Sequence, residues 1–154
     1  MGDSHTLLMH ATCVWLAGRG ILLRGQPGAG KSDLALRLMG GGGMLVADDQ
    51  VALRAWPGWL EATAPAVLAG LIEVRGAGVV RVPYRRKARI DLLVDLMAAG
   101  DVPRLPEREH EVVAGVGIPR YRLDLFEASA VAKLRMLGRE EQCLAPVDRR
   151  TLTG

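Results

Sequence analysis

The sequence predicts an α/β fold with a central mixed β-sheet flanked by helices. Short apolar runs typical of buried strands recur along the chain, and two longer segments place apolar residues at the spacing of a helix. A glycine-rich segment joins one of the strands to the first helix. The 154 residues contain no internal repeat and no break in composition, so we expect residues 1–154 to form a single domain.

The first half of the chain begins with a predicted β-hairpin. The β-rich runs 12–17 and 21–24 are separated by a Gly-Arg-Gly turn at 18–20. The segment 32–39 places apolar residues on one side of a helix, and four glycines end that helix at 40–43. A short apolar run at 44–47 then predicts a buried strand, which delivers two aspartates at its carboxyl end.

The second half alternates strands and turns before a final helix. We expect a strand and a turn over 51–60, a glycine-interrupted segment over 70–82, and a strand over 90–97 for which a helix is the alternative. A charged loop over 101–111 should follow, and then one or two strands over 112–125. The chain should end with a helix over 127–137 and a loose polar tail from residue 139.

Composition and charge exclude several classes of protein. The net charge of +3 suits phosphate ligands or an acidic protein partner, and it is too small and too dispersed for nucleic acid. Cys13 and Cys143 form no Cys-x-x-Cys pair, which favours two free thiols in a reducing compartment. The uncharged stretch 6–18 has no positive segment before it and is too short to span a bilayer. We therefore expect a cytoplasmic protein that binds no membrane.

The strongest motif is a complete match to G-x-x-x-x-G-K-[ST], which reads Gly25-Gln26-Pro27-Gly28-Ala29-Gly30-Lys31-Ser32. Glycines let backbone N–H groups point into a concavity that holds phosphate oxygens, and the following helix adds its N-terminal dipole. In such a loop Lys31 reaches the β and γ phosphates and the Ser32 hydroxyl binds Mg²⁺. The motif therefore predicts a nucleoside triphosphate site with ATP and Mg²⁺, without specifying the reaction.

Two further groups of polar residues are candidates for the chemistry. Asp48 and Asp49 follow an apolar strand, where one carboxylate could hold Mg²⁺ and the other could take a proton from an attacking hydroxyl. A solvated turn is the alternative. Strand alternation places Glu73 and Arg75 on one face, as a metal ligand and a phosphate ligand or as an exposed ion pair.

Four blocks of the chain resemble the catalytic domain of bacterial HPr kinase/phosphorylase. They are Met9-His10-Ala11, the loop ending Gly30-Lys31-Ser32, Leu45-Val46-Ala47-Asp48-Asp49, and Leu71-Ile72-Glu73-Val74-Arg75-Gly76-Ala77-Gly78-Val79-Val80. The last block is close to the signature of that family. The resemblance covers roughly residues 9–137 and implies a P-loop-containing kinase domain of a short form that lacks the family's separate N-terminal domain.

The resemblance implies an ATP-dependent protein-serine kinase that phosphorylates HPr, a small phosphocarrier protein, and that can also dephosphorylate it by phosphorolysis. Asp49 would accept the proton from serine, with Asp48 as the alternative, and His10 would orient this acid. Lys31 would bind phosphates, Ser32 and Glu73 would bind Mg²⁺, and Arg104 matches an active-site arginine. The family is a homo-oligomer, a hexamer. A small-molecule P-loop kinase and an inactive ATP-binding regulator are the rival hypotheses.

Overall fold

A computed structural model describes residues 6–104 and 109–137 of the chain. The predicted polar tail from residue 139, Cys143 and part of the predicted loop 101–111 lie outside these residues. The strands are β1 Thr6–His10, β2 Thr12–Leu16, β3 Arg19–Arg24, β4 Met44–Ala47, β5 Gln50–Trp56, β6 Trp59–Thr63, β7 Leu71–Val74, β8 Gly78–Arg81, β9 Lys87–Leu96, β10 Glu109–Val113 and β11 Val116–Leu123. The helices are α1 Lys31–Gly40 and α2 Ala130–Met136, with short 3₁₀ turns at Ala66–Leu68 and Ala99–Asp101.

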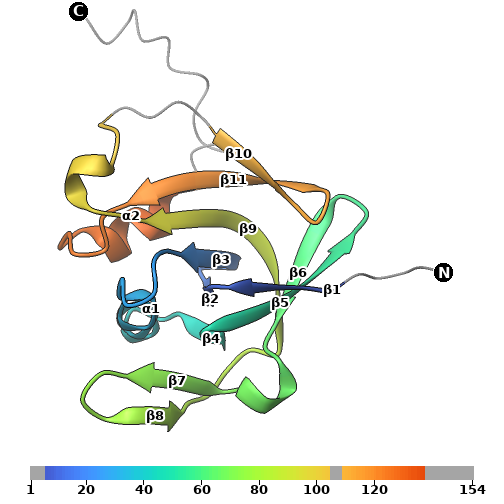
Figure 1. Cartoon of the computed structure of the whole chain (residues 1–154), viewed down its shortest axis with the longest axis horizontal. Helices are drawn as coiled ribbons and strands as arrows, with labels where there is room; N and C mark the ends of the chain where they lie inside the picture. Colours follow the sequence, from blue (N-terminus) through green and yellow to red (C-terminus); the bar gives the residue numbers. More distant parts are fainter. Residues whose placement is uncertain (1–5, 105–108, 138–154) are drawn as a thin grey trace, which may run out of the picture.

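The strands of the described part form one curled mixed sheet and one separate hairpin (Figure 1). The sheet runs β1-β5-β6-β9-β3-β2-β4, and β11 adds to the other side of β9 and carries β10 at its edge. Strands β3, β9 and β11 are parallel, and the remaining pairs within the sheet are antiparallel. The carboxyl ends of three parallel strands therefore meet at one edge, where ligands bind in open α/β sheets.

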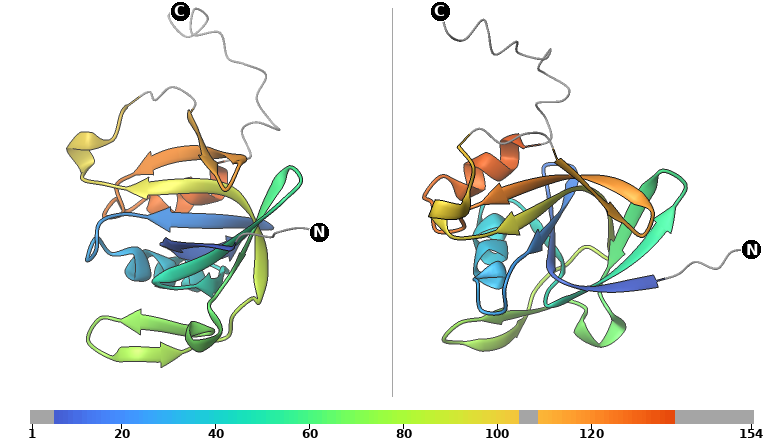
Figure 2. Two further views of the ribbon diagram at one scale, coloured as in Figure 1. Left: turned by 45° about the vertical axis from the view of Figure 1, so that its right-hand side comes forward. Right: turned by 45° about the horizontal axis from the view of Figure 1, so that its top comes forward.

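Strand β9 connects the two halves of this sheet. Its first residues pair with β6, and its later residues pair with β3 and β11. The register of β3 against β9 shifts between Gly20 and Ile21, which is a β-bulge. A bulge bends a strand and reverses which residues face each side. This bend is where β1, β5 and β6 turn away from the rest of the sheet (Figure 2).

Two clusters of buried apolar side chains lie on opposite sides of the sheet. One contains residues of both helices, including Leu34 and Leu38 of α1 and Leu134 of α2, packed against β2, β3 and β9. The other is built from strands and their connections alone, with Leu53 of β5 and Leu60 of β6 among its members. Both helices therefore cover one side, and the sheet covers the other side by folding over itself.

Most of the predicted elements are confirmed. The bounds of α1 lie within one residue of the prediction and those of α2 within three, and the segment predicted over 90–97 belongs to strand β9 and not to a helix. The turn of the first hairpin is shorter than predicted: Leu16 pairs with Arg19, so Ala17 and Gly18 make it, both with positive φ. The prediction of a loop over 101–111 is wrong for Glu109–Glu111, which belong to β10, and β1 was not predicted.

Hairpin β7–β8 lies apart from the main sheet, at the lower edge of Figure 1. Ile72 anchors it by inserting into the helix-containing core, and Tyr84 forms an isolated bridge with Leu45 after the hairpin. The turn between β7 and β8 places Gly76 and Gly78 at a φ of 90°, a conformation that glycine adopts without the steric cost that other residues pay. An added Cβ at either glycine would meet nothing, so they serve the turn and not a close approach.

Candidate active site

The loop between β3 and α1 has the geometry of an anion-binding turn. Gly28 has a φ of 80° and Gly30 a φ of 103°, values at which a residue with a Cβ is strained. A Cβ at Gly30 would also lie only 3.0 Å from Cδ1 of Leu125. Gly30 is the N-cap of α1 and makes no side-chain hydrogen bond. The N-terminus of α1 therefore presents its backbone N–H groups and the positive end of its dipole to the loop.

Lys31 is held inside the curve of this loop. Its Nζ donates hydrogen bonds to the carbonyl oxygens of Gly25 at 3.0 Å and Gln26 at 3.2 Å. The residue is only 7% exposed, and a buried ammonium requires such partners. The positive charge is therefore positioned at the centre of the loop by the backbone around it.

Asp48 connects the loop to two distant strands. Its carboxylate accepts hydrogen bonds from the Ser32 hydroxyl at 2.8 and 3.0 Å, from the Thr12 hydroxyl at 2.9 Å and from the Glu73 backbone N–H at 3.1 Å. The residue is 5% exposed. A carboxylate with this many donors is fixed in place and stays ready to accept hydrogen bonds. Asp48 thus lies beside Ser32, where a Mg²⁺ ligand of a P-loop protein belongs.

Asp49 has a different environment from its neighbour. Its side chain is 66% exposed, and its Oδ1 lies 3.5 Å from Nδ1 of His10, which is 50% exposed. Its φ of 69° is in the left-handed region, and the turn is held by hydrogen bonds from Ala11 N–H to Asp49 O and from Gln50 N–H to Asp48 O. Backbone conformations of this kind concentrate at functional sites, where surrounding structure maintains them.

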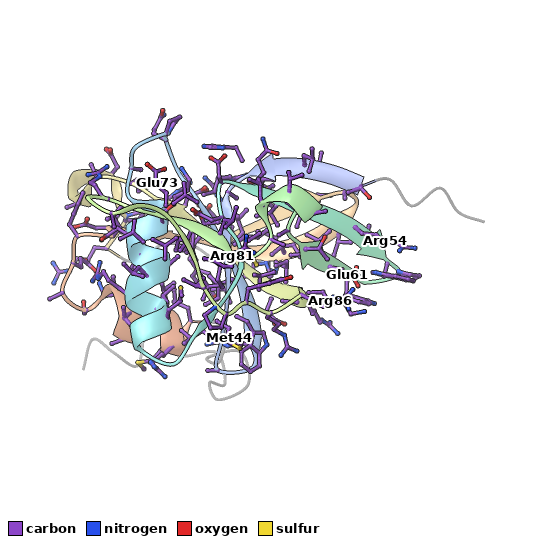
Figure 3. The ribbon with its side chains drawn as sticks, turned by 90° about the horizontal axis from the view of Figure 1, so that it is seen from below. Met44, Arg54, Glu61, Glu73, Arg81 and Arg86 are labelled. Atoms are coloured by element: carbon purple, nitrogen blue, oxygen red, sulfur yellow. The ribbon has the colours of Figure 1, made fainter. Side chains whose placement is uncertain are left out.

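These groups line one pocket of about 450 Å³. Its walls include the predicted loop residues 27–32 together with His10, Asp48, Asp49, Glu73 and Arg75. Figure 3 shows the Glu73 side chain at the end of the molecule where α1 begins. Glu73 and Arg75 do not share a strand as predicted, because β7 ends at Val74, but the turn brings both to the pocket.

Arg104 is not among the residues that line the pocket; it is exposed after the Ala99–Asp101 turn. Sequence reasoning missed Thr12, Asp33, Leu36, Leu125 and Phe126, which do line it. Leu125 and Phe126 come from a segment 93 or more residues beyond the loop, and no local pattern marks them. Thr12 and Asp33 adjoin motif residues, which is the signal that could have found them.

A network of ion pairs lies on the strand just before the loop. Arg24 donates to Asp95 at 2.7 and 3.0 Å and to Glu111 at 2.5 and 2.7 Å, and Arg120 donates to Asp95 at 2.5 Å. Burial alone would raise the pKa of Asp95, but the hydrogen bonds from Arg24 and Arg120 outweigh it, so this pKa is lowered. The hydrogen bonds from Arg24 also lower the pKa of Glu111. The network joins β3, β9, β10 and β11 immediately next to Gly25.

The donor set of the pocket fits a hard cation better than a soft one. Ser32 supplies a hydroxyl oxygen, and Asp48 and Glu73 supply carboxylates, which are the ligands Mg²⁺ takes while it keeps several waters. The described residues contain no cluster of three or more His, Cys, Asp or Glu side chains that could hold a metal alone.

The sheet, the glycine loop at the carboxyl end of β3 and the helix that follows it define a P-loop domain. The chain belongs to the family described as HPr Serine kinase C-terminal domain, whose model matches residues 4–135.

Individual relatives agree with this assignment. The HPr kinase/phosphorylase of Azoarcus sp. (strain BH72) is 37% identical over 82% of this chain and 44% of its own length. That of Aromatoleum aromaticum is 38% identical over 85% of this chain and 46% of its own length. The chain thus spans about half the length of these curated relatives.

The fold is also found in a solved structure, that of the Hpr(Ser) kinase/phosphatase from Coxiella burnetii. The TM-score is 0.79 at 23% sequence identity, with 89% of this chain and 91% of that chain covered.

The described helices are short: the longest, α1, has 10 residues, fewer than the roughly 20 that a membrane-spanning helix needs.

Proposed function

We propose that this protein is a cytoplasmic, ATP-dependent protein-serine kinase that phosphorylates HPr or an HPr-like phosphocarrier protein. The observation that carries the proposal is the arrangement of the two neighbouring aspartates. Asp48 is bonded to Ser32 of the phosphate-binding loop, and Asp49 beside it is open to solvent and to His10. In this proposal the loop would hold the phosphates, Ser32 with its neighbours would hold the cation and Asp49 would act as the base, which are the parts that phosphoryl transfer requires.

The loop residues 25–32 would hold the phosphates of ATP through backbone N–H groups, and Lys31 would neutralise charge on the transferring group. Bound Mg²⁺ would supply further charge neutralisation and alignment of the phosphates. Ser32, Asp48 and Glu73 would hold this ion, since all three residues line the same pocket and carry oxygen donors. Arg75, at the same pocket, is suited to an equatorial phosphate oxygen.

Asp49 would accept the proton of the serine hydroxyl as the oxygen attacks phosphorus. Its carboxylate is the exposed acid of the pair, whereas Asp48 already accepts hydrogen bonds from three groups. His10, with Nδ1 3.5 Å from Asp49 Oδ1, would orient this carboxylate. In the reverse direction, inorganic phosphate would attack the phosphorus of the phosphoserine, and the phosphoryl group would pass to it to form pyrophosphate. The serine oxygen would leave and take a proton from Asp49.

The test is transfer of label from ATP to HPr in the presence of Mg²⁺, with HPr whose target serine is changed to alanine as the control. Label on HPr but not on the control supports a protein-serine kinase. Binding of ATP without labelling of HPr would contradict the proposal and favour an inactive regulator, and labelling of a metabolite would favour a small-molecule kinase. Release of pyrophosphate from phosphorylated HPr and phosphate tests the reverse reaction.

Two variants separate the roles of residues in the pocket. Lys31→Ala should abolish transfer, because the ammonium at the centre of the loop is lost. Asp49→Asn should keep ATP binding and lose transfer, because the amide cannot accept the proton. Equal loss of ATP binding and transfer in Asp49→Asn would assign Asp49 to the metal instead. Arg104→Ala tests the proposed active-site arginine, and sedimentation tests the proposed homo-oligomer, a hexamer.

A further inference from the structure

One side of the sheet formed by β1, β5, β6 and the start of β9 has no layer over it among the described residues. Residues alternate along these strands, and Val51, Leu53, Leu60 and Ala62 point into the strand-only core. Their neighbours therefore point to solvent on the opposite side. We call this the basic–aromatic face; its members are Leu8, Ala52, Arg54, Trp56, Trp59, Glu61, Thr63, Lys87 and Arg89.

The aromatic part of this face is ordered by stacking. Trp56 pairs with Trp59 across the hairpin, and their rings are stacked with centroids 5.7 Å apart and planes at 9°. The Arg54 guanidinium lies 4.2 Å from the centroid of the Trp56 ring, and that of Arg89 lies 6.0 Å from the centroid of Trp59. Trp56 is nonetheless 36% exposed. Large rigid side chains that stay in solvent are typical of binding hot spots, where Trp and Arg are enriched.

The charge of this face is predominantly positive. Arg54, Lys87 and Arg89 are exposed, and Glu61, the acid directly between Arg54 and Arg89 in the strand register, is half-buried. Figure 3 shows Arg86 near Arg54 and Glu61, at the end of the molecule away from Glu73. Three cations, Arg54, Lys87 and Arg89, therefore stand against the single carboxylate of Glu61 on this face.

The same strands lead from this face to the reacting groups. His10 at the end of β1 pairs with Gln50 at the start of β5, and Gln50 follows Asp49. Arg54 is five residues from Asp49, so at roughly 3.3 Å per residue it lies about 17 Å away along β5. A metabolite bound at Asp49 would not reach this face, whereas a small protein with its hydroxyl at Asp49 would lie over it.

We propose that the basic–aromatic face is the docking surface for the phosphoacceptor protein, and that it binds an acidic patch about 17 Å from the acceptor serine. This inference rests on the proposed function and names how the protein substrate is recognised. The mixture of Glu61, Thr63 and Leu8 with the cations is typical of a protein interface, which is only partly charged. A single-stranded nucleic acid would favour a continuous cationic groove that tracks its backbone, and the carboxylate of Glu61 between Arg54 and Arg89 opposes such a path.

The test compares three forms of the protein in steady-state transfer from ATP to HPr: wild type, Arg54→Glu/Arg89→Glu, and Arg81→Glu. Arg81 is an exposed cation on β8, outside the face, and is the matched control. We expect the double variant to raise the KM for HPr roughly tenfold or more, because attraction becomes repulsion at two positions. Its kcat at saturating HPr and its KM for ATP should stay at the wild-type values, and Arg81→Glu should change none of them.

Salt gives an independent readout. The KM for HPr of the wild type should rise with ionic strength, and that of the double variant should not. The milder Arg54→Gln/Arg89→Gln variant should show an intermediate KM, which a folding defect would not produce. An unchanged KM for HPr in an active double variant overturns the docking surface alone. Absence of transfer by the wild type overturns the proposed function and the docking proposal with it.

Binding to nucleic acid is tested with the tryptophan fluorescence of the face. HPr should change the emission of the wild type and leave that of a Trp56→Ala/Trp59→Ala variant unchanged. Single-stranded RNA that changes the emission at lower concentration than HPr does would overturn the choice of a protein partner.

Discussion

Asp48 and Asp49 are adjacent in sequence, yet we expect the replacement of Asp48 to destabilise the fold far more than the replacement of Asp49. Asp48 is 5% exposed, and its carboxylate accepts hydrogen bonds from Ser32, Thr12 and the backbone of Glu73. Hydrogen bonds to a charged group contribute about 1.5–3 kcal/mol each, and donors left without a partner add a desolvation cost. Because these effects are not additive, we expect Asp48→Ala to lower the free energy of unfolding by about 3 kcal/mol.

Asp49 should contribute little to the folded state. A non-glycine residue in the left-handed region costs about 1–2 kcal/mol, and Asp49 has a φ of 69°. Asp49→Gly relieves that strain but loses about 0.5–1 kcal/mol through the entropy of the unfolded chain, so the two effects nearly cancel. Asp49→Ala keeps the strain and should be about 1 kcal/mol less stable than Asp49→Gly.

The assay is urea unfolding followed by circular dichroism, without Mg²⁺ or nucleotide, so that metal binding does not contribute. The midpoint should fall clearly for Asp48→Ala and stay near that of the wild type for Asp49→Gly. Thr12→Val is a partial control, since it removes one of the donors to Asp48. Equal losses for Asp48→Ala and Asp49→Gly, or a loss below about 0.5 kcal/mol for Asp48→Ala, would refute the assignment of a structural role to Asp48.

Three further outcomes are expected. Gly30→Ala should lower the free energy of unfolding by about 1–2 kcal/mol, because φ is 103° and the new Cβ would press against Leu125; urea unfolding measures it, and a stable variant would contradict the strain. Burial would raise the pKa of Asp95, but the hydrogen bonds from Arg24 and Arg120 outweigh it and lower this pKa. The carboxylate therefore stabilises the fold above its unfolded pKa near 3.8, and this stabilisation is lost as the pH falls through the lowered folded pKa. In thermal unfolding between pH 6 and pH 3, the melting temperature of Asp95→Asn should fall less with acid than that of the wild type. Burial raises the pKa of the Cys13 thiol, so alkylation mapped by mass spectrometry should modify Cys13 in urea but not in the native protein.

Local patterns predicted much of this protein because they depend on residues close together in the chain. The loop of residues 25–32 is marked by glycines whose backbone conformation a Cβ would disturb, and a strand and a helix flank it as the motif requires. Asp48 and Asp49 were placed at a strand end by the apolar run before them. The family could be recognised from the block around Glu73.

Other features depend on which strands meet, and local patterns do not contain that information. Strand β1 is exposed along its length except for the partly buried Met9, so its own residues show no strand alternation, and only its pairing with β5 defines it. Leu125 and Phe126 reach the pocket only because the chain returns past α1 after β11. The ion pairs of Arg24 with Asp95 and Glu111 join residues 71 and 87 positions apart.

The sequence by itself therefore determined the glycine loop of residues 25–32, the class of fold and the pair of acids at a strand end, since each follows from a short spacing of residue types. Only the tertiary structure decided that Asp48 is bonded to the loop while Asp49 faces solvent and His10. It also decided that β1, β5, β6 and the start of β9 pair so that the residues of the basic–aromatic face share one side of the sheet. The physical reason is that burial, strand register and pairing are set by long-range contacts, which depend on the whole chain and not on any one segment.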